Sequence, residues 1–469
     1  MGSTFAGLNT AFLGLTAARM GLDVAGQNIT NAKTPGYTRQ RIDLSSNPSV
    51  GRAGLFSQPL PTPGGGVTVD SISRLGNIHL DNRVRGAASS YGFHGVRAEA
   101  LHTLETRLNE PGENGLSSAL NKFWSGWADL SNNTGQPAAA GVVIEQANVI
   151  AGQIAEGYRG VDEQWTSVRA TVGTSADELN NIGRQIAELN DLIRSAAAAG
   201  GSVNELMDKR ALLATAVSQI AGGQTVHREN GSIDVLIGGN PLVSGSDFNA
   251  VKIVGGTKMG DTVQLEWAKH PGLAIPLSGG ELGANLNVLL PAAQGGALDQ
   301  AAQAFNDVAT ALAATVNAIH QTGSTPNGTT GLDFFRITPG APAALSLEVI
   351  PTNVNEIAAG KVGGGPLDGS IADQISQAGK GPGSADTIWS TFVTGVGVVT
   401  QAEKRQATLA EIASVNAFNA QQSQGGVDLD EENLNIVEAQ TAYQAAARVM
   451  TAVDELLDTL INKTGLVGR

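Results

Sequence analysis

The sequence predicts a mainly α-helical protein with a β insertion (α+β, multidomain), built from several structural units. Three observations indicate this class: heptad repeats at both ends of the chain, helical periodicity over most of the region between them, and alternating apolar residues in one central segment. A chain of 469 residues is also long for a single hydrophobic core. We therefore expect terminal heptad helices, a long helical-bundle stem and a small β domain inserted in the middle of the chain.

The first thirty residues carry a seven-residue repeat. The repeat has a column of large apolar residues and a column of alanines: Leu8, Leu15, Leu22 and Ile29, and Ala11, Ala18 and Ala25. Such a pattern predicts a helix that packs closely against other helices. It ends at Thr34-Pro35-Gly36, because proline disfavours helix for the residue before it.

The last forty residues carry a matching repeat. Its two columns are Ala439, Ala446, Val453 and Leu460, and Tyr443, Met450 and Leu457. Asp428 is the expected N-cap, followed by further acids at the positive end of the helix dipole.

Neither terminal helix is expected to be stable on its own, because one apolar seam does not offset the cost of ordering about 30 residues. This favours association through the termini over a closed monomeric bundle. We expect residues 1–40 and 425–469 to form a coiled-coil assembly region that is disordered in the monomer.

Between the ends, helical patterns cover about 76–109, 139–195, 203–221, 298–320 and 386–422, and strand-like runs occur at 41–45 and 67–72. These segments predict a stem domain made of 41–222, 299–323 and 386–424.

A β-rich domain is expected over residues 223–298. Apolar residues alternate there with polar ones in two runs, namely Ile233, Val235 and Ile237, and Val263, Leu265 and Trp267. Residues 324–385 are rich in Gly, Pro and Ala, with one strand-like run at 344–350. We interpret them as a loop-rich, shortened insertion.

Composition argues against several functions. The 29 basic and 43 acidic residues give a net charge of −14, which disfavours binding to nucleic acid or an anionic membrane. No run of about 18 apolar residues predicts membrane insertion. The apolar stretch 11–18 follows no positive charge, so no signal peptide is expected. The absence of cysteine excludes disulfides, thiolate zinc sites and cysteine nucleophiles.

No catalytic, cofactor-binding or metal site is predicted, so we expect no cofactor and no enzymatic activity. The histidines, His79, His94, His102, His227, His270 and His320, lack zinc-binding spacing. No phosphate-binding loop or nucleophile elbow occurs in the sequence. The acids around Asp428 lack the glycine and spacing of a calcium loop.

Two terminal motifs resemble bacterial flagellar rod, hook and hook-associated proteins. The first spans 28–37 and the second 426–432, and the residues that carry the resemblance are Asn28, Asn31, Pro35, Gly36, Tyr37, Asp428 and Glu431. Lys33 departs from the usual asparagine. Segments 37–40, 64–67, 72–74, 123–131 and 333–335 are most similar to the hook-associated protein 1 (FlgK) family within this group.

This resemblance implies a structural protein of the hook–filament junction. The implied partners are further copies of the chain in a ring or helical layer, the hook protein, a second junction protein, and a cytoplasmic export chaperone that holds the C-terminal helix. The implied location is the extracellular flagellum, after type III export from the cytoplasm without a cleaved signal.

Two alternatives remain open from the sequence. The first is a hook or rod protein of the same axial group, which should lack long helices between 76 and 222. The second is an enzyme or adhesin that uses 223–298 as its working domain on a helical stalk.

Overall fold

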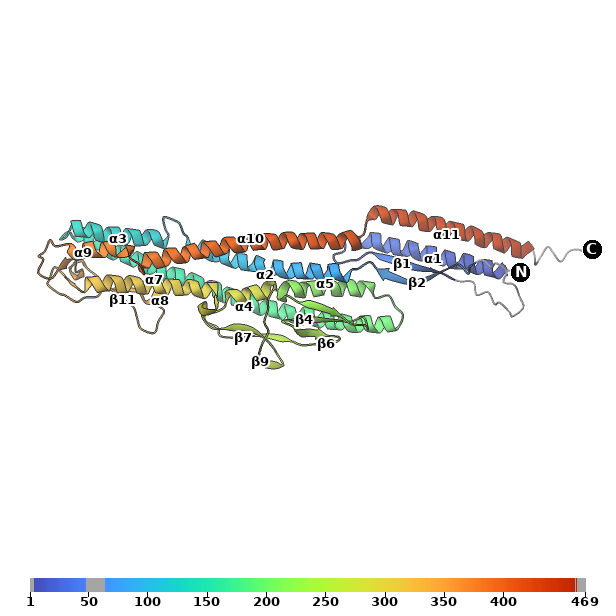
Figure 1. The fold of residues 1–469 in the computed structure, drawn as a ribbon, viewed down its shortest axis with the longest axis horizontal. Coiled ribbons are helices and arrows are strands. Elements are labelled where there is room, and N and C mark those ends of the chain that lie inside the picture. The colour runs from blue at the N-terminus through green and yellow to red at the C-terminus, as the bar shows by residue number, and fades with distance from the viewer. Residues whose placement is uncertain (1–3, 48–63, 460, 462–469) are drawn as a thin grey trace, which may run out of the picture.

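A computed structural model describes residues 4–47, 64–459 and 461, and these form a long rod with both termini at one end (Figure 1). The α-helices are α1 (Thr4–Asn31), α2 (Ile78–Leu108), α3 (Leu116–Asn132), α4 (Pro137–Ala198), α5 (Asn204–Ala221), α6 (Gly280–Val288), α7 (Ala297–His320), α8 (Ala343–Ser346), α9 (Ser370–Gln377), α10 (Ala385–Gly425) and α11 (Leu429–Asp458). The long helices predicted from periodicity are therefore confirmed.

The stem is a bundle in which α10 packs along α2, and α4 packs against α3, α5 and α7. At about 1.5 Å per residue, the 62 residues of α4 extend roughly 90 Å along the rod. The largest completely buried side chains lie along this bundle: Trp127, Trp165, Trp389, Phe123, Phe334, Phe335, Leu104, Leu120, Ile150, Ile154, Leu179 and Ile186. These residues form one continuous core.

One helix among the described residues, α4, is long and apolar enough by hydropathy to cross a membrane. Apolar residues of α4 pack inside the protein instead, since Ile150, Trp165 and Ile186 are each completely buried in the stem. The hydropathy of α4 is that of a core helix in a long bundle.

The hairpin of β1 (Gln40–Ser46) and β2 (Val67–Arg74) confirms the two strand-like runs near the N-terminus. The strands are antiparallel, with Gln40 opposite Arg74 and an irregularity at Asp43–Leu44. The hairpin contacts α1. Strands β1 and β2 therefore lie beside α1, whereas the sequence-based prediction assigned residues 41–222 to the stem.

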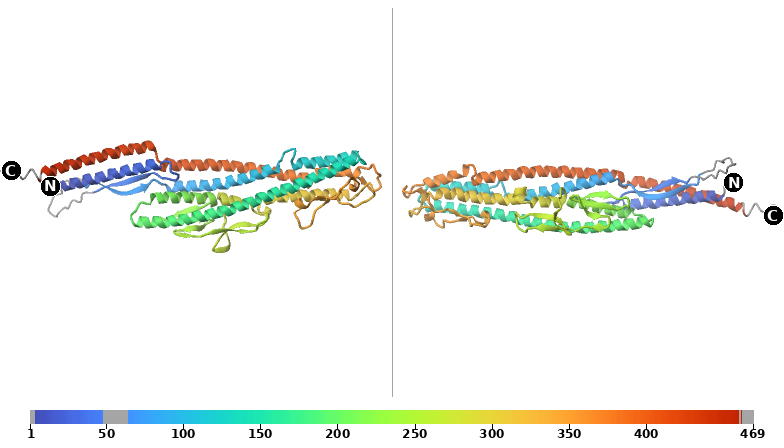
Figure 2. Two further views of the ribbon diagram at one scale, coloured as in Figure 1. Left: turned by 180° about the vertical axis from the view of Figure 1, so that it is seen from behind. Right: turned by 60° about the horizontal axis from the view of Figure 1, so that its bottom comes forward.

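The β-rich region consists of two antiparallel sheets beside α4 (Figure 2). Their strands are β3 (Gln224–His227), β4 (Ile233–Ile237), β5 (Asn240–Ser244) and β6 (Asp247–Phe248) in one sheet, and β7 (Val251–Gly255), β8 (Val263–Trp267) and β9 (His270–Ala274) in the other. All six alternating apolar residues noted in the sequence are buried. The region ends sooner than predicted, because 280–288 form helix α6, which packs on α2 and α5.

Residues 324–385 contain more order than a loop-rich remnant. Short strand pairs form between β10 (Gly323–Ser324) and β13 (Gly360–Lys361), and between β11 (Phe335–Arg336) and β12 (Glu348–Val349). Helix α9 buries Ile371 and Ile375 and packs against α3.

The predicted strand at 344–350 is wrong over most of its length. Residues 343–346 form α8 after Pro342, and the side chain of Asn306 accepts a hydrogen bond from the Ala344 amide at 3.0 Å. Only Glu348 and Val349 pair as a strand. The contact with α7 decides the local conformation here.

Helices α1 and α11 form an antiparallel pair, called here the terminal pair, at the end that carries both termini (Figure 1). The predicted N-cap is confirmed, because the Asp428 side chain accepts hydrogen bonds from the amides of Asp430 and Glu431 at 2.9 and 3.4 Å. Gly426 adopts an extended conformation and separates α10 from α11. The prediction that both ends are disordered in the isolated monomer remains a prediction.

Candidate assembly site at the terminal helices

The terminal pair packs through a column of glycines in α1. A Cβ added at Gly7, Gly14 or Gly21 would lie 3.5–3.7 Å from a side chain of α11, and the partners are Val453, Ala446 and Ala439. Residue numbers rise along one helix as they fall along the other, in steps of seven, so one antiparallel register holds throughout. These are ordinary van der Waals distances, so small residues of the two helices face one another along this column.

This glycine column was not predicted from the sequence. It has the same seven-residue spacing as the leucines that were singled out, so the signal was present. The three glycines lie in one register of α1, and each of them faces a side chain of α11.

In α1, the structure brings together the two predicted columns and the glycines. The alanines Ala11, Ala18 and Ala25 are buried, whereas Leu8, Leu15, Leu22 and Ile29 are half-buried. Large side chains therefore flank the contact with α11, and small residues occupy it.

In α11, the predicted residues are more open to solvent. Half-buried members are Ala439, Ala446, Met450, Val453 and Leu457. Tyr443 is 37% exposed, and Leu460 lies outside the described residues. Among the described residues of α11, only Glu432 is fully buried.

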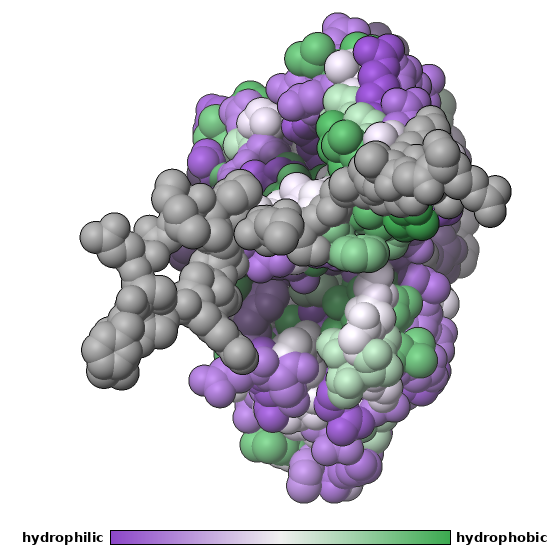
Figure 3. Space-filling model, turned by 90° about the vertical axis from the view of Figure 1, so that its right-hand side faces the viewer, coloured by the Kyte–Doolittle hydropathy of each residue, from purple (hydrophilic) through white to green (hydrophobic). Residues whose placement is uncertain are grey.

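Large apolar residues of the terminal pair face solvent. They are Phe5, Phe12 and Met20 in α1, and Leu429, Leu434, Val437, Tyr443, Val449 and Leu456 in α11, with exposed fractions from 37% to 68%. Viewed from this end, apolar surface lies between polar margins (Figure 3). Exposed apolar surface of this extent is typical of an interaction site.

An open groove of about 650 Å³ lies between the two helices of the terminal pair and the β1–β2 hairpin. Its lining includes the small residues Gly14, Ala18 and Ala439 and also Leu44 of β1. The groove thus offers an apolar, sterically open surface on which side chains of another helix could be seated.

The first motif is explained by a turn that ends α1. Asn28 is 1% exposed; its side-chain amide donates to the Gln40 carbonyl at 2.9 Å, and its side-chain oxygen accepts from the Gln40 amide at 3.0 Å and from the Tyr37 hydroxyl at 2.9 Å. Gly36 has φ of +77°, a conformation that favours glycine. Asn28 therefore fixes the turn between α1 and β1.

The remaining motif residues shape the same turn. Asn31 accepts a hydrogen bond from the Thr34 hydroxyl at 3.2 Å, and Pro35 is exposed beyond it. Glu431, of the second motif, forms an ion pair with Arg39 just after the turn.

Ion pairs hold the joint between the terminal pair and the stem, which is formed by residues 36–40, 74–81 and 421–432. Arg39 pairs with Glu431 and with the buried Glu432, and its amide donates to the Gly425 carbonyl at 2.8 Å. Arg74 pairs with Asp208 of α5, which also accepts from the Thr38 amide at 2.9 Å. Three segments far apart in the sequence thus form this joint, and Asp208 of α5 contacts two of them.

Burial is the main cause of the pKa shifts of two side chains in this joint, Asp208 and Tyr37. Desolvation raises the pKa of Asp208, and the guanidinium of Arg74 opposes that shift. Burial, followed by the nearby carboxylates of Asp208, Glu205 and Glu432, raises the pKa of Tyr37 to about 12. Tyr37 therefore stays protonated further into the alkaline range than a free tyrosine, and as the phenol it donates a hydrogen bond to Asn28.

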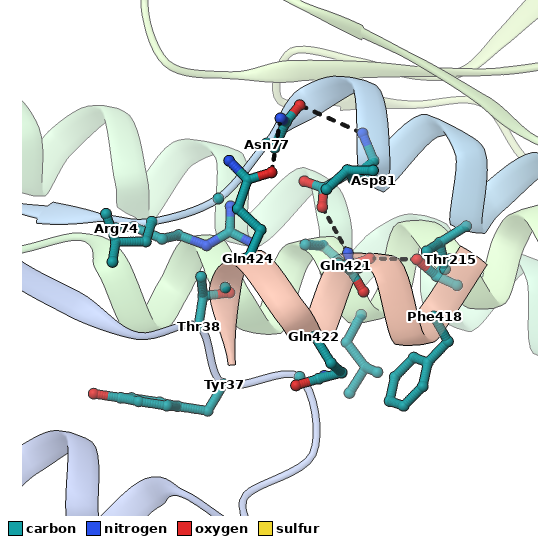
Figure 4. A pocket seen from close by; sticks show the side chains of 18 of the residues that line it. Tyr37, Thr38, Arg74, Asn77, Asp81, Thr215, Phe418, Gln421, Gln422 and Gln424 are labelled. Atoms are coloured by element: carbon teal, nitrogen blue, oxygen red, sulfur yellow. Dashed lines mark hydrogen bonds between the residues drawn. The ribbon is translucent and has the colours of Figure 1, made fainter. Parts of the chain in front are cut away.

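A small cavity of about 120 Å³ lies inside the joint (Figure 4). Gln421 of α10 donates to Asp81 at 2.6 Å, and Asn77 donates to Gln424 at 3.0 Å. These contacts tie α10 to the start of α2. The cavity lining is used in this packing, so the structural role of the joint accounts for it.

Among the described residues, no cluster of three His, Asp or Glu side chains could hold a metal ion. The most buried histidine, His320, accepts from the Ala358 amide at Nε2 and lies 2.7 Å from the Leu332 carbonyl through Nδ1. Burial lowers the pKa of His320. Its neutral ring therefore acts as a structural bridge.

Two parts of the chain match known protein families. Residues 101–335 match the family model of the flagellar hook-associated protein FlgK helical domain, and residues 423–463 match that of the flagellar basal body rod FlgEFG protein C-terminal region. The second match covers the whole of α11.

The similar curated proteins are described as flagellar hook-associated protein 1. Flagellar hook-associated protein 1 of Bacillus subtilis (strain 168) is 29% identical over 517 aligned positions, covering 100% of both chains. Flagellar hook-associated protein 1 of Escherichia coli (strain K12) is 29% identical over 349 positions, covering 72% of this chain and 61% of the relative. The solved structure of the flagellar hook junction protein FlgK from Burkholderia pseudomallei is similar in fold, with a TM-score of 0.62 at 16% identity, covering 73% of this chain and 100% of that one.

Proposed function

The chain belongs to the family of the flagellar hook-associated protein FlgK, and on that premise we propose that it joins hook and filament by packing its terminal pair against further copies of itself. The family consists of structural flagellar proteins, not enzymes. The chemistry of the junction is therefore that of helix packing. This assignment replaces both earlier alternatives, the hook or rod protein and the enzyme or adhesin.

One observation carries the proposal. Helix α11 has 30 residues, yet among those described it fully buries only Glu432, while Leu434, Val437 and Leu456 are between 57% and 67% exposed. A soluble helix normally buries one apolar face against its own protein. Helix α11 half-buries a narrow strip that includes Ala439, Ala446 and Val453, and the rest of its apolar surface is left for other subunits.

The protein is an extracellular component of the flagellum that assembles with other hook and filament components. We further propose that its immediate partners are the hook protein on one side and a second junction protein on the other. We also propose that a cytoplasmic chaperone covers α11 before type III export. The exposed apolar residues of α11 support this last point, because they favour aggregation while uncovered.

Substitution of the half-buried residues of α11 tests the proposal. Met450→Asp or Leu457→Asp places a charge where apolar contact is expected. Swimming and recovery of the protein in detached flagella should both be lost, while the thermal unfolding midpoint of the purified chain, which reports the stem core, stays unchanged.

Gln440→Asp is the matched control, because Gln440 is exposed and polar on the same helix. That variant should swim normally. Normal swimming by both Met450→Asp and Leu457→Asp would refute assembly through the terminal pair.

A further inference from the structure

The end of the rod opposite the termini, where α3 and α9 lie, contains a completely buried histidine (Figure 1). This residue, His320, is the last residue of α7 and is 0% exposed. Trp127 of α3 and Phe334 make T-shaped contacts with its ring, with centroids 6.3 and 5.5 Å away. The ring therefore lies in an apolar site, away from the water that would solvate a charge.

Both ring nitrogens of His320 form contacts, and the two nitrogens have opposite roles. Nε2 accepts a hydrogen bond from the Ala358 amide at 2.9 Å, so this nitrogen carries no proton. Nδ1 lies 2.7 Å from the Leu332 carbonyl, which can only accept, so the ring proton is on Nδ1. The two contacts fix the neutral ring in one tautomer and tie the end of α7 to two later segments of the chain.

The segment that donates to Nε2 also positions the elements that follow it. Ala358 is 0% exposed and lies two residues before β13, which pairs with β10. The carbonyl of the next residue, Ala359, accepts from the amides of Ile371 and Ala372 in α9, both at 3.0 Å. Loss of the contact at Nε2 would therefore loosen β13 and the start of α9 as well.

Protonation of this ring is incompatible with its surroundings. A proton added at Nε2 would face the Ala358 N–H, which places two donors against each other at 2.9 Å. The added charge would also be buried against Trp127 and Phe334 instead of being hydrated. The imidazolium can therefore form only after the contact with Ala358 has opened.

Charged groups around the ring do little to favour the imidazolium. Those on the segments that surround it are Lys122 and Asp129 of α3, Asp307 of α7, Asp333 and Arg336 beside Leu332, Glu356 and Lys361 on either side of Ala358, and Asp373 of α9. Burial lowers the pKa of His320, and this effect outweighs the Leu332 carbonyl and Asp333, which raise it. Asp333 is exposed, so water and salt screen its attraction for a charged ring.

We propose that His320 is a pH-sensitive switch that holds residues 324–385 closed at neutral pH and opens them as pH falls. Above about pH 6.5 the ring is neutral in the closed and the opened chain alike, so the full stabilisation by its two contacts is present. Below about pH 6.5 the opened chain takes up a proton that the closed chain does not, and the open form gains population. This switch lies at the end opposite the terminal pair and does not depend on the proposed function.

Amide hydrogen exchange of the full chain, followed by mass spectrometry at pH 7.5 and 5.0, tests the switch. Exchange rates are divided by those of unstructured peptides of the same sequence at the same pH, which removes the intrinsic effect of pH. Protection over residues 354–361 should fall by between about threefold and thirtyfold, the upper limit for one group with an ordinary pKa of about 6.5. Protection over residues 179–193 of α4, in the stem core, is the internal reference and should stay unchanged.

His320→Gln separates the histidine from other titrating groups. Glutamine carries an oxygen that can accept from the Ala358 amide, and it does not titrate. Its ratio of protection between pH 7.5 and 5.0 should be close to one, whatever its absolute protection. His102→Gln is the matched control, because the side chain of His102 is 49% exposed on α2, and this variant should keep the acid response of the parent chain.

Unchanged protection over residues 354–361 at pH 5.0 in the parent chain would overturn the proposal. An equal acid-induced loss in the parent chain and in His320→Gln would also overturn it, because carboxylates would then account for the response. A second measurement holds even if His320→Gln is already unprotected at pH 7.5. In the parent chain with ¹³C-labelled histidine, the ring signal that is absent from His320→Gln should titrate below pH 6.5, and titration at or above that value refutes the switch.

Discussion

In the stem, Phe123, Trp127 and Phe334 are completely buried, whereas in α11 the only fully buried residue among those described is Glu432. The stem aromatics also contact one another, with ring centroids of Trp127 and Phe334 5.2 Å apart. Both regions are built from long helices, so helix content does not distinguish them. They differ in whether one chain alone supplies a complete core.

This difference shows how a single chain can combine a stable body with an assembly surface. Apolar burial stabilises by roughly 25 cal/mol per Å², and the stem gains that stabilisation within the subunit. In the terminal pair Phe12, Leu434 and Val437 remain 55%, 67% and 58% exposed, so one chain alone does not gain this stabilisation there. On the proposed function, neighbouring copies cover these residues and complete the core of the terminal pair.

The largest difference in the free energy of unfolding is expected between two substitutions of phenylalanine by alanine. Phe334→Ala removes a side chain that is 0% exposed and should lower the free energy of unfolding by about 3–5 kcal/mol. Phe12→Ala removes one that is 55% exposed and should change it by less than about 0.5 kcal/mol in the isolated chain. Urea denaturation followed by tryptophan fluorescence measures both.

The two substitutions should have the opposite order of effect on incorporation into flagella. Phe12→Ala should reduce incorporation into flagella, whereas any Phe334→Ala chain that remains folded should assemble. Equal destabilisation of the isolated chain by the two substitutions would show that the terminal pair is as complete as the stem.

The next largest effect is expected at the joint. Arg39→Ala leaves the carboxylate of Glu432, which is 1% exposed, without its cation. Since Arg39 is itself partly exposed, we expect a cost of about 2–3 kcal/mol, below the full cost of a completely buried pair. The loss should appear as faster amide hydrogen exchange at the start of α11 and in β1.

The double variant Arg39→Ala, Glu432→Gln is the control for this prediction. It removes the unpaired charge and should restore much of the protection at the start of α11. If Arg39→Ala alone leaves exchange unchanged, the ion pairs do not hold the joint.

A smaller effect is expected at the glycine column. Gly14→Leu forces a large side chain toward Ala446 and should weaken the terminal pair by about 1–2 kcal/mol. Gly14→Ala adds only a Cβ, at an ordinary contact distance of 3.7 Å, and should leave the pair intact or slightly stabilised. Hydrogen exchange over α1 and α11 distinguishes the variants, and equal exchange in both would refute close packing at this column.

The helices, the heptad ends and the Asp428 cap could be predicted because each depends on residues close together in the sequence. The alternation Ile233, Val235, Ile237 likewise gave a strand whose apolar residues are buried. Helix α6 was missed because it follows immediately on the strands in a stretch rich in glycine. Its helical state depends on packing against α2 and α5.

The joint and the exposed apolar residues of α10 could not be predicted in this way. Arg39 and Glu432 lie 393 residues apart, and Thr38 and Asp208 lie 170 apart, so no local pattern marks them as partners. Leu409, Ile412 and Val415 of α10 are each more than half exposed, although Ala410 and Ala417 of the same helix are buried. Periodicity alone assigns large apolar residues to the core, and only the fold shows that this assignment is reversed here.

The smallest predicted effect concerns pH and compares the joint with the rest of the molecule. Tyr37 has a pKa of about 12 in the folded chain, above the ordinary value of 10, because burial and nearby carboxylates disfavour the phenolate. As pH rises past 10, the unfolded chain releases this proton before the folded chain does. The stabilisation is therefore complete below about pH 10 and is lost as pH rises toward 12.

Partial exposure of Tyr37 reduces the size of this effect to about 1 kcal/mol, well below the value for two full pKa units. Urea denaturation between about pH 9 and 12 measures it as the difference between the parent chain and Tyr37→Phe. Tyr37→Phe loses the hydrogen bond to Asn28 at every pH, but it should also lose this part of the alkaline slope. Other groups titrate equally in both chains, so parallel pH profiles would show that Tyr37 does not couple the joint to pH.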